Sequence, residues 1–561
     1  MDSSFSAETR RSNIAQMAAG QLDLVVIGSG VTGAGVARDA AMRGIRTGII
    51  DKGDFASGTS GKSSRLIHGG LRYLEMGHLG LVFEASRERR TLLRIAPHLV
   101  WPRSFIFPIH SGSRVPRWKL LAGLWLYDIL ALFRNVKRHE ALSKQELIRA
   151  EPNLRQKGLK GGARYYDAQC DDSRLTLANV RSAHSHGALA ANYVEMSEFD
   201  IADGAIQGIR VTDLVTGEKH VIRARVVVNA TGPWSDKIRK ELDGKPLLRP
   251  TKGAHVAVPR NRLGNNEAVT MTSPIDGRVM FIIPWGELSY IGTTDTDDDI
   301  DPGATCSSAE DVVYLLRSAN SMFPNARLQV DDVVSSWAGL RPLLRPMDPR
   351  DPSSVSREHK IVEDPLGMIS IVGGKLTTYR EMAAQVVNRV ARKLRSADGT
   401  KRPARSGSNR EPLPGGESKD TEVLVREVTR EGYPIGIAQS LVRRFGTESA
   451  AVLRLARSNR ELAKPIAQGH PSLRAELIFA CRREMALTLS DLLVRRTHVF
   501  YESPDHGLEQ ISEIASLVAV ELGWSVEEER LQVRHYTNLV HDCLAFKEEF
   551  SARQRSELGA G

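Results

Sequence analysis

Apolar and polar positions in the larger, N-terminal part of the chain predict both strands and helices. Residues 24–27 and 47–50 are short apolar runs, typical of buried parallel strands. The segment between them predicts a helix that ends near Arg43, where Gly44 is a stop signal. Further strands are predicted at residues 221–229, 278–294 and 369–372. This alternation of strands and helices indicates an α/β fold.

Beyond about residue 420 the pattern becomes helical. Residues 396–420 are polar, rich in Gly, Pro and Ser, and without periodicity, which predicts a linker. Helices are predicted at residues 422–430, 434–444, 474–493 and 506–522. Because this region carries no glycine fingerprint and no nucleophile motif, we expect a packing or assembly domain.

Composition places the chain among multi-domain globular proteins. It has 561 residues, of which 41% are hydrophobic and 26% are charged. The formal net charge is +10, from 77 Lys and Arg against 67 Asp and Glu. This excess favours a phosphorylated substrate, an acidic membrane surface or nucleic acid as partner, but the basic residues are scattered and decide nothing alone. Collagen-like, repeat and disulfide-scaffold classes are excluded.

Cysteine spacing and the N-terminal residues bear on the compartment. The four cysteines are far apart and form no CxxC pair, so we expect no metal site and no disulfides, and favour a reducing cytosol. Residues 1–20 lack the apolar core of a signal peptide, and we expect them to be disordered or loosely attached. No run of 18 apolar residues exists, so no membrane-spanning helix is expected.

A glycine fingerprint lies between the first predicted strand and helix. Gly28 permits a tight turn, Gly30 lets the backbone approach a pyrophosphate, and Gly33 lets the helix pack on the strand. The helix N-terminus attracts the anion, and Asp51, at the end of the second strand, suits the ribose hydroxyls. This context predicts a dinucleotide site; the alternative is a glycine-rich turn without a ligand.

The long polar loop at residues 53–75 identifies the dinucleotide. A nicotinamide enzyme needs only the short turn, whereas a loop rich in Ser, Thr and Gly can wrap an extended ligand. We therefore predict FAD, with an ordinary surface loop as the alternative. The predicted cofactor contacts in this loop are Thr59, Ser60, Ser63, Ser64, His68 and Gly69.

Several segments together resemble one enzyme family. LIHGGLRYLE at residues 66–75 is similar to a motif of the FAD-dependent glycerol-3-phosphate dehydrogenases, the respiratory, quinone-reducing enzymes. Further matching segments follow in order at residues 96–102, 227–236, 251–259, 282–297, 337–343, 373–383 and 482–497. The resemblance covers the chain from about residue 23 past residue 497.

The resemblance implies a discontinuous Rossmann-like FAD-binding domain, an α+β substrate (cap) domain and an all-α C-terminal domain. The expected boundaries are 21–88, 161–236 and 344–395 for the FAD-binding domain, 89–160 and 237–343 for the substrate domain, 396–420 for the linker and 421–561 for the helical domain. Further cofactor contacts are expected where two strands end, at Ala230, Gly232, Gly374, Lys375 and Leu376. A helix beginning near Thr377 or Thr378 would face the flavin ring with its N-terminus.

A glycerol 3-phosphate site needs cations for the phosphate and a base for the C2 hydroxyl. Arg341 is the first candidate for the phosphate, Arg72 is the second, and Tyr73 can add a hydroxyl contact. His255 is the preferred base because its ordinary pKa lies near neutrality. Lys375 could polarise the substrate, stabilise the reduced flavin or take the proton instead. The resemblance implies active-site roles for all five residues.

Residues 114–138 bear on membrane contact. Residues 120–133 are an apolar run of 14, interrupted by Asp128 and too short to span a bilayer. Aromatic residues and flanking basic residues suit an interfacial helix, and the alternative is a buried helix of the substrate domain. The basic flanks are Arg117, Lys119, Arg134, Lys137 and Arg138.

These patterns together predict an FAD-dependent enzyme that oxidises sn-glycerol 3-phosphate to dihydroxyacetone phosphate and reduces membrane quinone. The resemblance places it in the bacterial cytoplasm, bound peripherally to the inner face of the cytoplasmic membrane, with a homodimer as one option. The close alternative is an oxidase that uses oxygen. A nicotinamide dehydrogenase is a weaker one. A non-catalytic, basic nucleotide-binding module is disfavoured because no aromatic-basic motif for nucleic acid is present.

Overall fold

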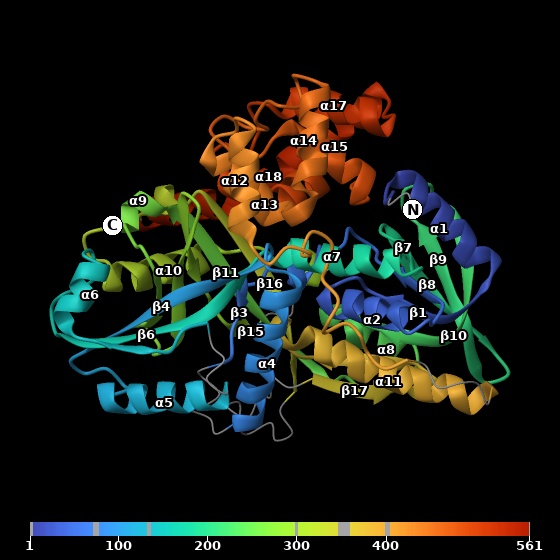
Figure 1. Cartoon of the computed structure of the whole chain (residues 1–561), viewed down its shortest axis with the longest axis horizontal. Helices are drawn as coiled ribbons and strands as arrows, with labels where there is room; N and C mark the ends of the chain where they lie inside the picture. The colour runs from blue at the N-terminus through green and yellow to red at the C-terminus, as the bar shows by residue number, and fades with distance from the viewer. Residues whose placement is uncertain are drawn as a thin grey trace.

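The computed structural model contains two β-sheets side by side, with a helical domain against one end of both (Figure 1). This arrangement confirms the predicted fold class: an α/β unit, an α+β unit and an all-helical C-terminal unit. The structure describes residues 4–70, 78–131, 136–297, 301–345, 359–398 and 404–559. No helix in these ranges is both long and apolar enough to cross a bilayer.

The first sheet has eight strands in the order β17-β18-β10-β1-β2-β7, with β9 beside β10 and β8 beside β9. Its central strands run parallel, because the chain returns through helices between them. The apolar runs predicted as strands therefore form its middle. The bounds are β1 (Gln21–Ile27), β2 (Thr47–Ile50), β7 (Leu189–Ala191), β8 (Val194–Ala202), β9 (Ala205–Asp213), β10 (Lys219–Asn229), β17 (His359–Glu363) and β18 (Ile369–Gly373).

Three helices cover one face of this sheet, α2 (Val31–Met42), α7 (Asp172–Ser185) and α11 (Tyr379–Asp398) (Figure 1). Alanines and glycines on α2 allow close packing; a Cβ at Gly35 would lie 2.9 Å from the Tyr379 ring. The predicted helix start near Thr377 is a 3₁₀ turn, Leu376–Thr378, that leads directly into α11. The core between these helices and the strands holds the glycine turn in place.

The expectation that residues 1–20 are disordered or loosely attached is wrong for the part that the structure describes. α1 (Ala7–Ala19) begins at an N-cap, where the Ser6 side chain accepts from Thr9 N–H. Arg10 is buried and forms an ion pair with Asp213 on β9, while Phe5 is 2% exposed. The sequence pattern missed this because the buried face combines two polar residues, Arg10 and Asn13, with only two apolar ones, Ile14 and Met17.

The second sheet has ten strands in the order β15-β11-β14-β13-β12-β4-β6-β3, with β16 beside β11 and β5 beside β6. The pairing of β11 with β16 sets His255 opposite Trp337 and Thr251 opposite Arg341. The bounds are β3 (Leu66–Ile67), β4 (Val100–His110), β5 (Glu140–Leu142), β6 (Leu159–Cys170), β11 (Leu248–Pro259), β12 (Ala268–Thr272), β13 (Val279–Trp285), β14 (Leu288–Gly292), β15 (Thr296–Asp297) and β16 (Ser335–Leu344).

One predicted domain boundary is wrong. The division between residues 160 and 161 cuts through β6, which pairs along its whole length with β4 in the second sheet. The chain returns to the first sheet only after Cys170, where α7 begins. Glycines inside β6 weaken the strand pattern of the sequence. They stand where neighbouring backbone approaches closely. A Cβ at Gly162 would lie 3.1 Å from the carbonyl carbon of Phe107.

Helices also cover the second sheet. α10 packs its apolar face on β11 and β14, and α5 packs on the side of β4 and β6. Figure 1 shows α5 on the side of the molecule away from the C-terminal helices. The bounds are α4 (Leu79–Ile95), α5 (Arg117–Leu130), α6 (Lys144–Ala150), α8 (Ser235–Lys240), α9 (Arg260–Leu263) and α10 (Ala309–Met322).

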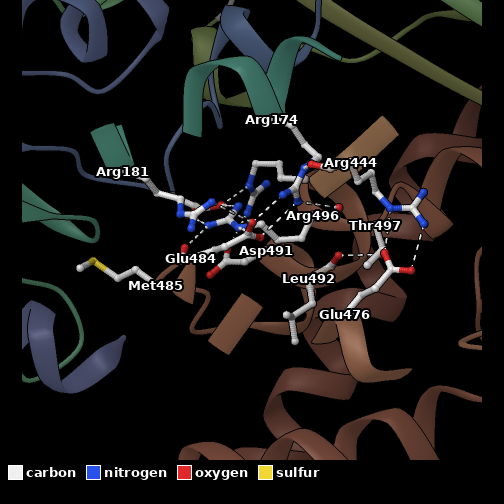
Figure 2. Close-up of polar contacts among 12 residues, drawn as sticks. Arg174, Arg181, Arg444, Glu476, Glu484, Met485, Asp491, Leu492, Arg496 and Thr497 are labelled. Carbon is white, nitrogen blue, oxygen red and sulfur yellow. Dashed lines mark hydrogen bonds and ion pairs between the residues drawn. The ribbon is translucent and has the colours of Figure 1, made fainter. Parts of the chain in front are cut away.

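The predicted helix at residues 474–493 is wrong beyond Arg483. The helix stops because the buried Glu484 carboxylate turns to Arg174 on α7, at 2.5 Å, and Met485 takes a φ of +51° (Figure 2). The predicted helix at 506–522 begins only at Ile511. The bounds are α12 (Thr421–Arg430), α13 (Ile435–Phe445), α14 (Ser449–Ser458), α15 (Arg474–Arg483), the π-helix η9 (Asp491–Arg496), α16 (Val499–Glu502), α17 (Ile511–Leu522) and α18 (Val526–Gly559).

The segment predicted as a linker, 396–420, is firmly attached where the structure describes it. Two backbone carbonyls, of Ser408 and Glu411, accept hydrogen bonds from the buried Arg38 on α2. Leu413 is fully buried, and its N–H donates to Ile95. The polar composition predicted a linker. The backbone of this segment is nevertheless held by Arg38, a residue that lies far away in the sequence.

Candidate active site

A cavity of about 1020 Å³ runs between the two sheets, from the ends of the parallel strands to α5. The first sheet contributes the glycine turn and the turns after β2, β10 and β18, and the second sheet contributes parts of β11 and β16. These predicted site residues line the cavity: Gly28, Gly30, Asp51, Thr59, Ser60, Ser63, Ser64, His68, Ala230, Gly232, His255, Arg341, Gly374, Lys375 and Leu376. Residues far apart in sequence therefore meet in one chamber.

The glycine turn has the shape of a pyrophosphate cradle. Gly28 has a φ of +96°, and a Cβ there would lie 2.8 Å from the Ala230 carbonyl oxygen. A Cβ at Gly33 would overlap the Gly28 carbonyl, so α2 can approach β1 only with glycine at this position. α2 begins at Val31, whose N–H donates to Ser60 Oγ at 2.9 Å. The free N–H groups at this helix end fit the negative charge of a dinucleotide.

Asp51 is held in place at the end of β2. Its carboxylate accepts from Ser29 N–H at 2.6 Å, from Ser29 Oγ at 2.8 Å and from Gly53 N–H at 3.0 Å. Burial raises the pKa of Asp51, and these hydrogen bonds act in the opposite direction. The position fits the predicted contact with ribose hydroxyls. Ser29 was missed, although it stands inside the glycine run.

The loop after β2 joins the two sheets. Thr59 Oγ1 donates to the Leu340 carbonyl on β16 at 2.6 Å. Ser63 donates to Asp172 at the start of α7 through both its N–H and its hydroxyl. Lys52 lies 4.6 Å from the centre of the Trp234 ring, a cation–π pair at the cavity wall that the sequence did not suggest. These contacts hold the loop, which contains a 3₁₀ turn at Thr59–Gly61, along the wall of the cavity.

His255 lies on β11 between two flat surfaces. Its ring stacks on Trp337 at 5.1 Å with an angle of 8°, and a Cβ at Gly292 would lie 2.8 Å from its Nε2. Nε2 is 2.8 Å from Ser64 Oγ, and the buried Nδ1 has no hydrogen-bond partner among the described residues. Burial lowers the pKa of His255 to about 3, and the cations Arg341 and Arg65 add to this effect. The imidazole is therefore neutral and able to accept a proton.

Arg341 presents a fixed guanidinium at the cavity. It donates to Thr293 Oγ1 at 2.8 Å, to the Thr294 carbonyl at 3.1 Å and to Asp295 at 3.1 Å. The guanidinium lies over Gly253, where a Cβ would come within 2.6 Å of its central carbon. This geometry suits a phosphate that competes with Asp295 for the planar group.

Lys375 follows two glycines with left-handed backbone, Gly373 at a φ of +76° and Gly374 at +98°. A Cβ at Gly374 would lie 2.6 Å from Met382 Sδ, so this turn requires glycine for space as well as for conformation. The turn places Lys375 at the cavity, on the side of the first sheet and across from His255 on the second.

Two of the described site residues, Gly33 and Gly69, do not line the cavity. Arg72 and Tyr73 are outside the described residues. Gly33 supports helix packing, and Gly69 donates its N–H to Tyr127 Oη at 3.0 Å and to Asp167 at 3.1 Å. Tyr127 belongs to α5, whose Lys119, Leu120, Gly123 and Leu126 line the far end of the cavity. The sequence predicted α5 only as a membrane or core helix and missed its place in the cavity wall.

Comparisons with known proteins agree with this geometry. Residues 23–380 match the model of a family described as FAD dependent oxidoreductase, and residues 406–529 match the C-terminal domain of alpha-glycerophosphate oxidase. The aerobic glycerol-3-phosphate dehydrogenase of Staphylococcus haemolyticus (strain JCSC1435) is 34% identical over 533 residues, which are 93% of this chain and 94% of that protein.

Solved structures agree as well. The glycerol-3-phosphate dehydrogenase from Bacillus halodurans, complexed with FAD, is similar with a TM-score of 0.80 and 32% identity, over 96% of this chain and 98% of that chain. The L-alpha-glycerophosphate oxidase from Mycoplasma pneumoniae shares the fold, with a TM-score of 0.54 and 17% identity over 70% of this chain and 99% of that chain. The predicted cofactor, FAD, is confirmed at family level. The chain belongs to the FAD-dependent oxidoreductases and, within them, to the aerobic glycerol-3-phosphate dehydrogenase family.

Proposed function

We propose that this protein oxidises sn-glycerol 3-phosphate to dihydroxyacetone phosphate and passes the electrons to membrane quinone. The observation that carries the proposal is the single cavity that joins the dinucleotide cradle to Arg341 and His255. FAD, when bound, supplies the acceptor for the hydride that leaves C2. Gly28, Gly30 and Asp51 would hold its pyrophosphate and ribose.

Arg341 and His255 would have different roles toward the substrate. The Arg341 guanidinium would bind the phosphate through the N–H donors at its planar edge and so fix the position of C2. The neutral His255 imidazole would accept the C2 hydroxyl proton, and its low pKa lets it release that proton afterwards. Lys375 is the alternative acceptor of the proton and would otherwise add positive charge at the cavity.

Quinone is the proposed electron acceptor because of the position of α5. Its inner face lines the cavity at Leu120 and Gly123, while its outer face exposes Trp118 by 72%, Trp125 by 52% and Ile129 by 50%. An exposed aromatic and aliphatic face with basic neighbours suits the interface of an anionic membrane. We propose attachment through this helix to the inner face of a bacterial cytoplasmic membrane.

Anaerobic spectroscopy tests the reaction. Purified protein with bound FAD should be yellow and should bleach when sn-glycerol 3-phosphate is added, but not with glycerol 1-phosphate of the opposite configuration. A spectrum unchanged by sn-glycerol 3-phosphate would exclude the proposed substrate.

The acceptor is tested on the bleached protein. A soluble quinone analogue should restore the yellow colour much faster than air-saturated buffer does. Faster recovery with oxygen, with formation of hydrogen peroxide, would instead identify an oxidase.

A further inference from the structure

Arg65 is a buried arginine held mainly by aromatic rings. Its guanidinium carbon lies 4.5 Å from the ring centre of Trp285, 5.0 Å from Tyr290, 5.1 Å from Tyr501 and 5.5 Å from Trp337. The side chain is 2% exposed, and Nη1 donates to Tyr290 Oη at 2.9 Å. This cage lies directly behind the cavity wall, because the preceding residue, Ser64, lines the cavity.

Two other buried arginines are each neutralised by a carboxylate at hydrogen-bond distance. Arg174 donates twice to Glu484, and Arg444 donates twice to Glu476, as Figure 2 shows. For Arg65 the ion-pair contact is Asp172, with 3.8 Å between Nε and the carboxylate. Its charge is therefore spread over ring faces and less completely cancelled at contact distance.

Two contacts lead from this cage to His255, and a third holds Trp337 against the segment that carries Ser64. Trp337, one wall of the cage, stacks on the imidazole at 5.1 Å. The same indole donates through Nε1 to the Ser63 carbonyl at 3.2 Å. Ser64, bonded covalently to Arg65, places its hydroxyl 2.8 Å from His255 Nε2.

We propose that Arg65 is a positioning residue for the reaction: held by the aromatic cage, it fixes the Trp337 ring and the Ser64 hydroxyl that orient His255. The cage draws on the second sheet for three rings and on the C-terminal domain for Tyr501. The helical domain thereby becomes part of the support of the active site. The inference rests on the function proposed above.

The charged and titratable groups around this unit are few. Arg341 on β16 and Arg65 both lower the pKa of His255, after burial, which is the larger cause. Tyr290 from β14, Asp172 and its neighbour Asp171 at the start of α7, and Tyr501 from α16 raise the pKa of Arg65 against the opposing effect of burial. Removal of the Arg65 charge should therefore raise the pKa of His255 while Arg341 and burial keep acting on it.

Two variants test the role in the FAD-loaded protein. Arg65→Met keeps a long buried side chain but removes the cation, and Arg65→Lys keeps a cation in the cage. Anaerobic flavin reduction by sn-glycerol 3-phosphate should slow by about 10- to 100-fold in Arg65→Met, because small displacements of reacting groups cost that much. The acid limb of the pH–rate profile of Arg65→Met should move up by about one pH unit. Arg65→Lys should restore the pH profile and part of the rate.

Arg10→Met is the matched control. Arg10 on α1 is equally buried and paired with Asp213, and it is not among the charges that act on His255, so its loss should lower the melting temperature without moving the pH profile. An unshifted profile and a normal rate in Arg65→Met would overturn the proposal. The same shift in Arg10→Met would overturn it as well.

If Arg65→Met does not fold, a milder variant tests the proposal instead. Tyr290→Phe removes the acceptor of the hydrogen bond from Arg65 Nη1 and should slow flavin reduction by about 3- to 10-fold. Tyr536→Phe, which loses an equivalent buried bond to His506 in the helical domain, should reduce normally. Equal rates for the two variants would contradict the role of Arg65.

A histidine NMR titration separates this inference from the proposed function. Selective ¹⁵N labelling, with His255→Asn for assignment, should show the His255 pKa rising in Arg65→Met whether or not the substrate reduces the flavin. If glycerol 3-phosphate fails to bleach the wild-type protein, the proposed function falls, and the titration still supports or overturns the role of Arg65.

Discussion

The guanidinium of Arg341 lies directly over Gly253, so that a Cβ at residue 253 would come within 2.6 Å of its central carbon and 2.8 Å of Nη1. The two residues belong to paired strands, β16 and β11, whose register sets Arg341 opposite Thr251, two positions before Gly253 on the same strand. The space left by one missing side chain therefore determines how the proposed phosphate ligand is held.

Gly253→Ala should displace Arg341 without affecting the dinucleotide cradle. Loss of one charge-assisted hydrogen bond to phosphate costs about 1.5–3 kcal/mol, so the Kd for glycerol 3-phosphate should rise about 10- to 100-fold. FAD content should stay normal. Gly436→Ala, at a position where a Cβ meets no neighbour, is the control. Unchanged affinity in Gly253→Ala would show that Arg341 does not bind the phosphate.

Gly30→Val should abolish FAD binding. The new side chain would project toward Ser60 Oγ, 3.1 Å from the Cβ position, and fill the space at the N-terminus of α2. The measurement is the ratio of flavin absorbance to protein after purification. Gly20→Ala, where the Cβ makes only an ordinary contact, should keep full flavin content. A fully loaded Gly30→Val protein would mean that the cradle is misplaced.

His255→Asn should slow flavin reduction by about 10²- to 10⁴-fold, the usual cost of losing a general base. The wild-type rate should stay high as the pH falls through 6, because the pKa of His255 is lowered to about 3 and the ring stays neutral. Stopped-flow reduction under anaerobic conditions measures both. A nearly normal rate of flavin reduction in His255→Asn, together with a slow rate in Lys375→Met, would identify Lys375 as the group that accepts the proton.

Replacing Trp118 and Trp125 by Ser should weaken membrane attachment. Both are more than half exposed on α5, and burial of each in the headgroup region would contribute about 1.5–3 kcal/mol. Flotation with anionic vesicles should fall sharply, while flavin reduction by glycerol 3-phosphate continues. The control replaces Ile435 and Val520, exposed apolar residues of the helical domain, by Ser. Equal flotation of both variants would exclude α5 as the attachment site.

Asp54 should make the protein sensitive to acid. Burial would raise its pKa, but Arg496 and Arg495 outweigh burial and lower it from 3.8 to about 2. The folded pKa is below the unfolded value, so the stabilisation, about 2 kcal/mol, is present above pH 4 and is lost as the pH falls toward 2. The melting temperature of Asp54→Asn should be lower at neutral pH and fall less steeply below pH 4. Parallel curves would contradict this coupling.

Local features of the site were predictable from the sequence. β2 was predicted at residues 47–50 and is Thr47–Ile50, and the glycine turn leads into α2 as expected. Both follow from short-range rules: an apolar run favours a buried strand, and a glycine with positive φ permits the turn. The resemblance to a family then added His255, Arg341 and Lys375, which line the same cavity.

Contacts between distant residues were decided only by the tertiary structure. Ser64 and His255 are 191 positions apart, and Tyr127 reaches Gly69 across 58 positions. No periodicity encodes such pairs, because they depend on strand register and on how the two sheets pack. Local patterns, in contrast, do not depend on register. From them and from the resemblance, the sequence by itself determined that a dinucleotide turn, two kinds of sheet and a helical domain would form. Only folding decided that Arg65 would lie in an aromatic cage and α5 in the cavity wall, since both positions arise where separate units meet.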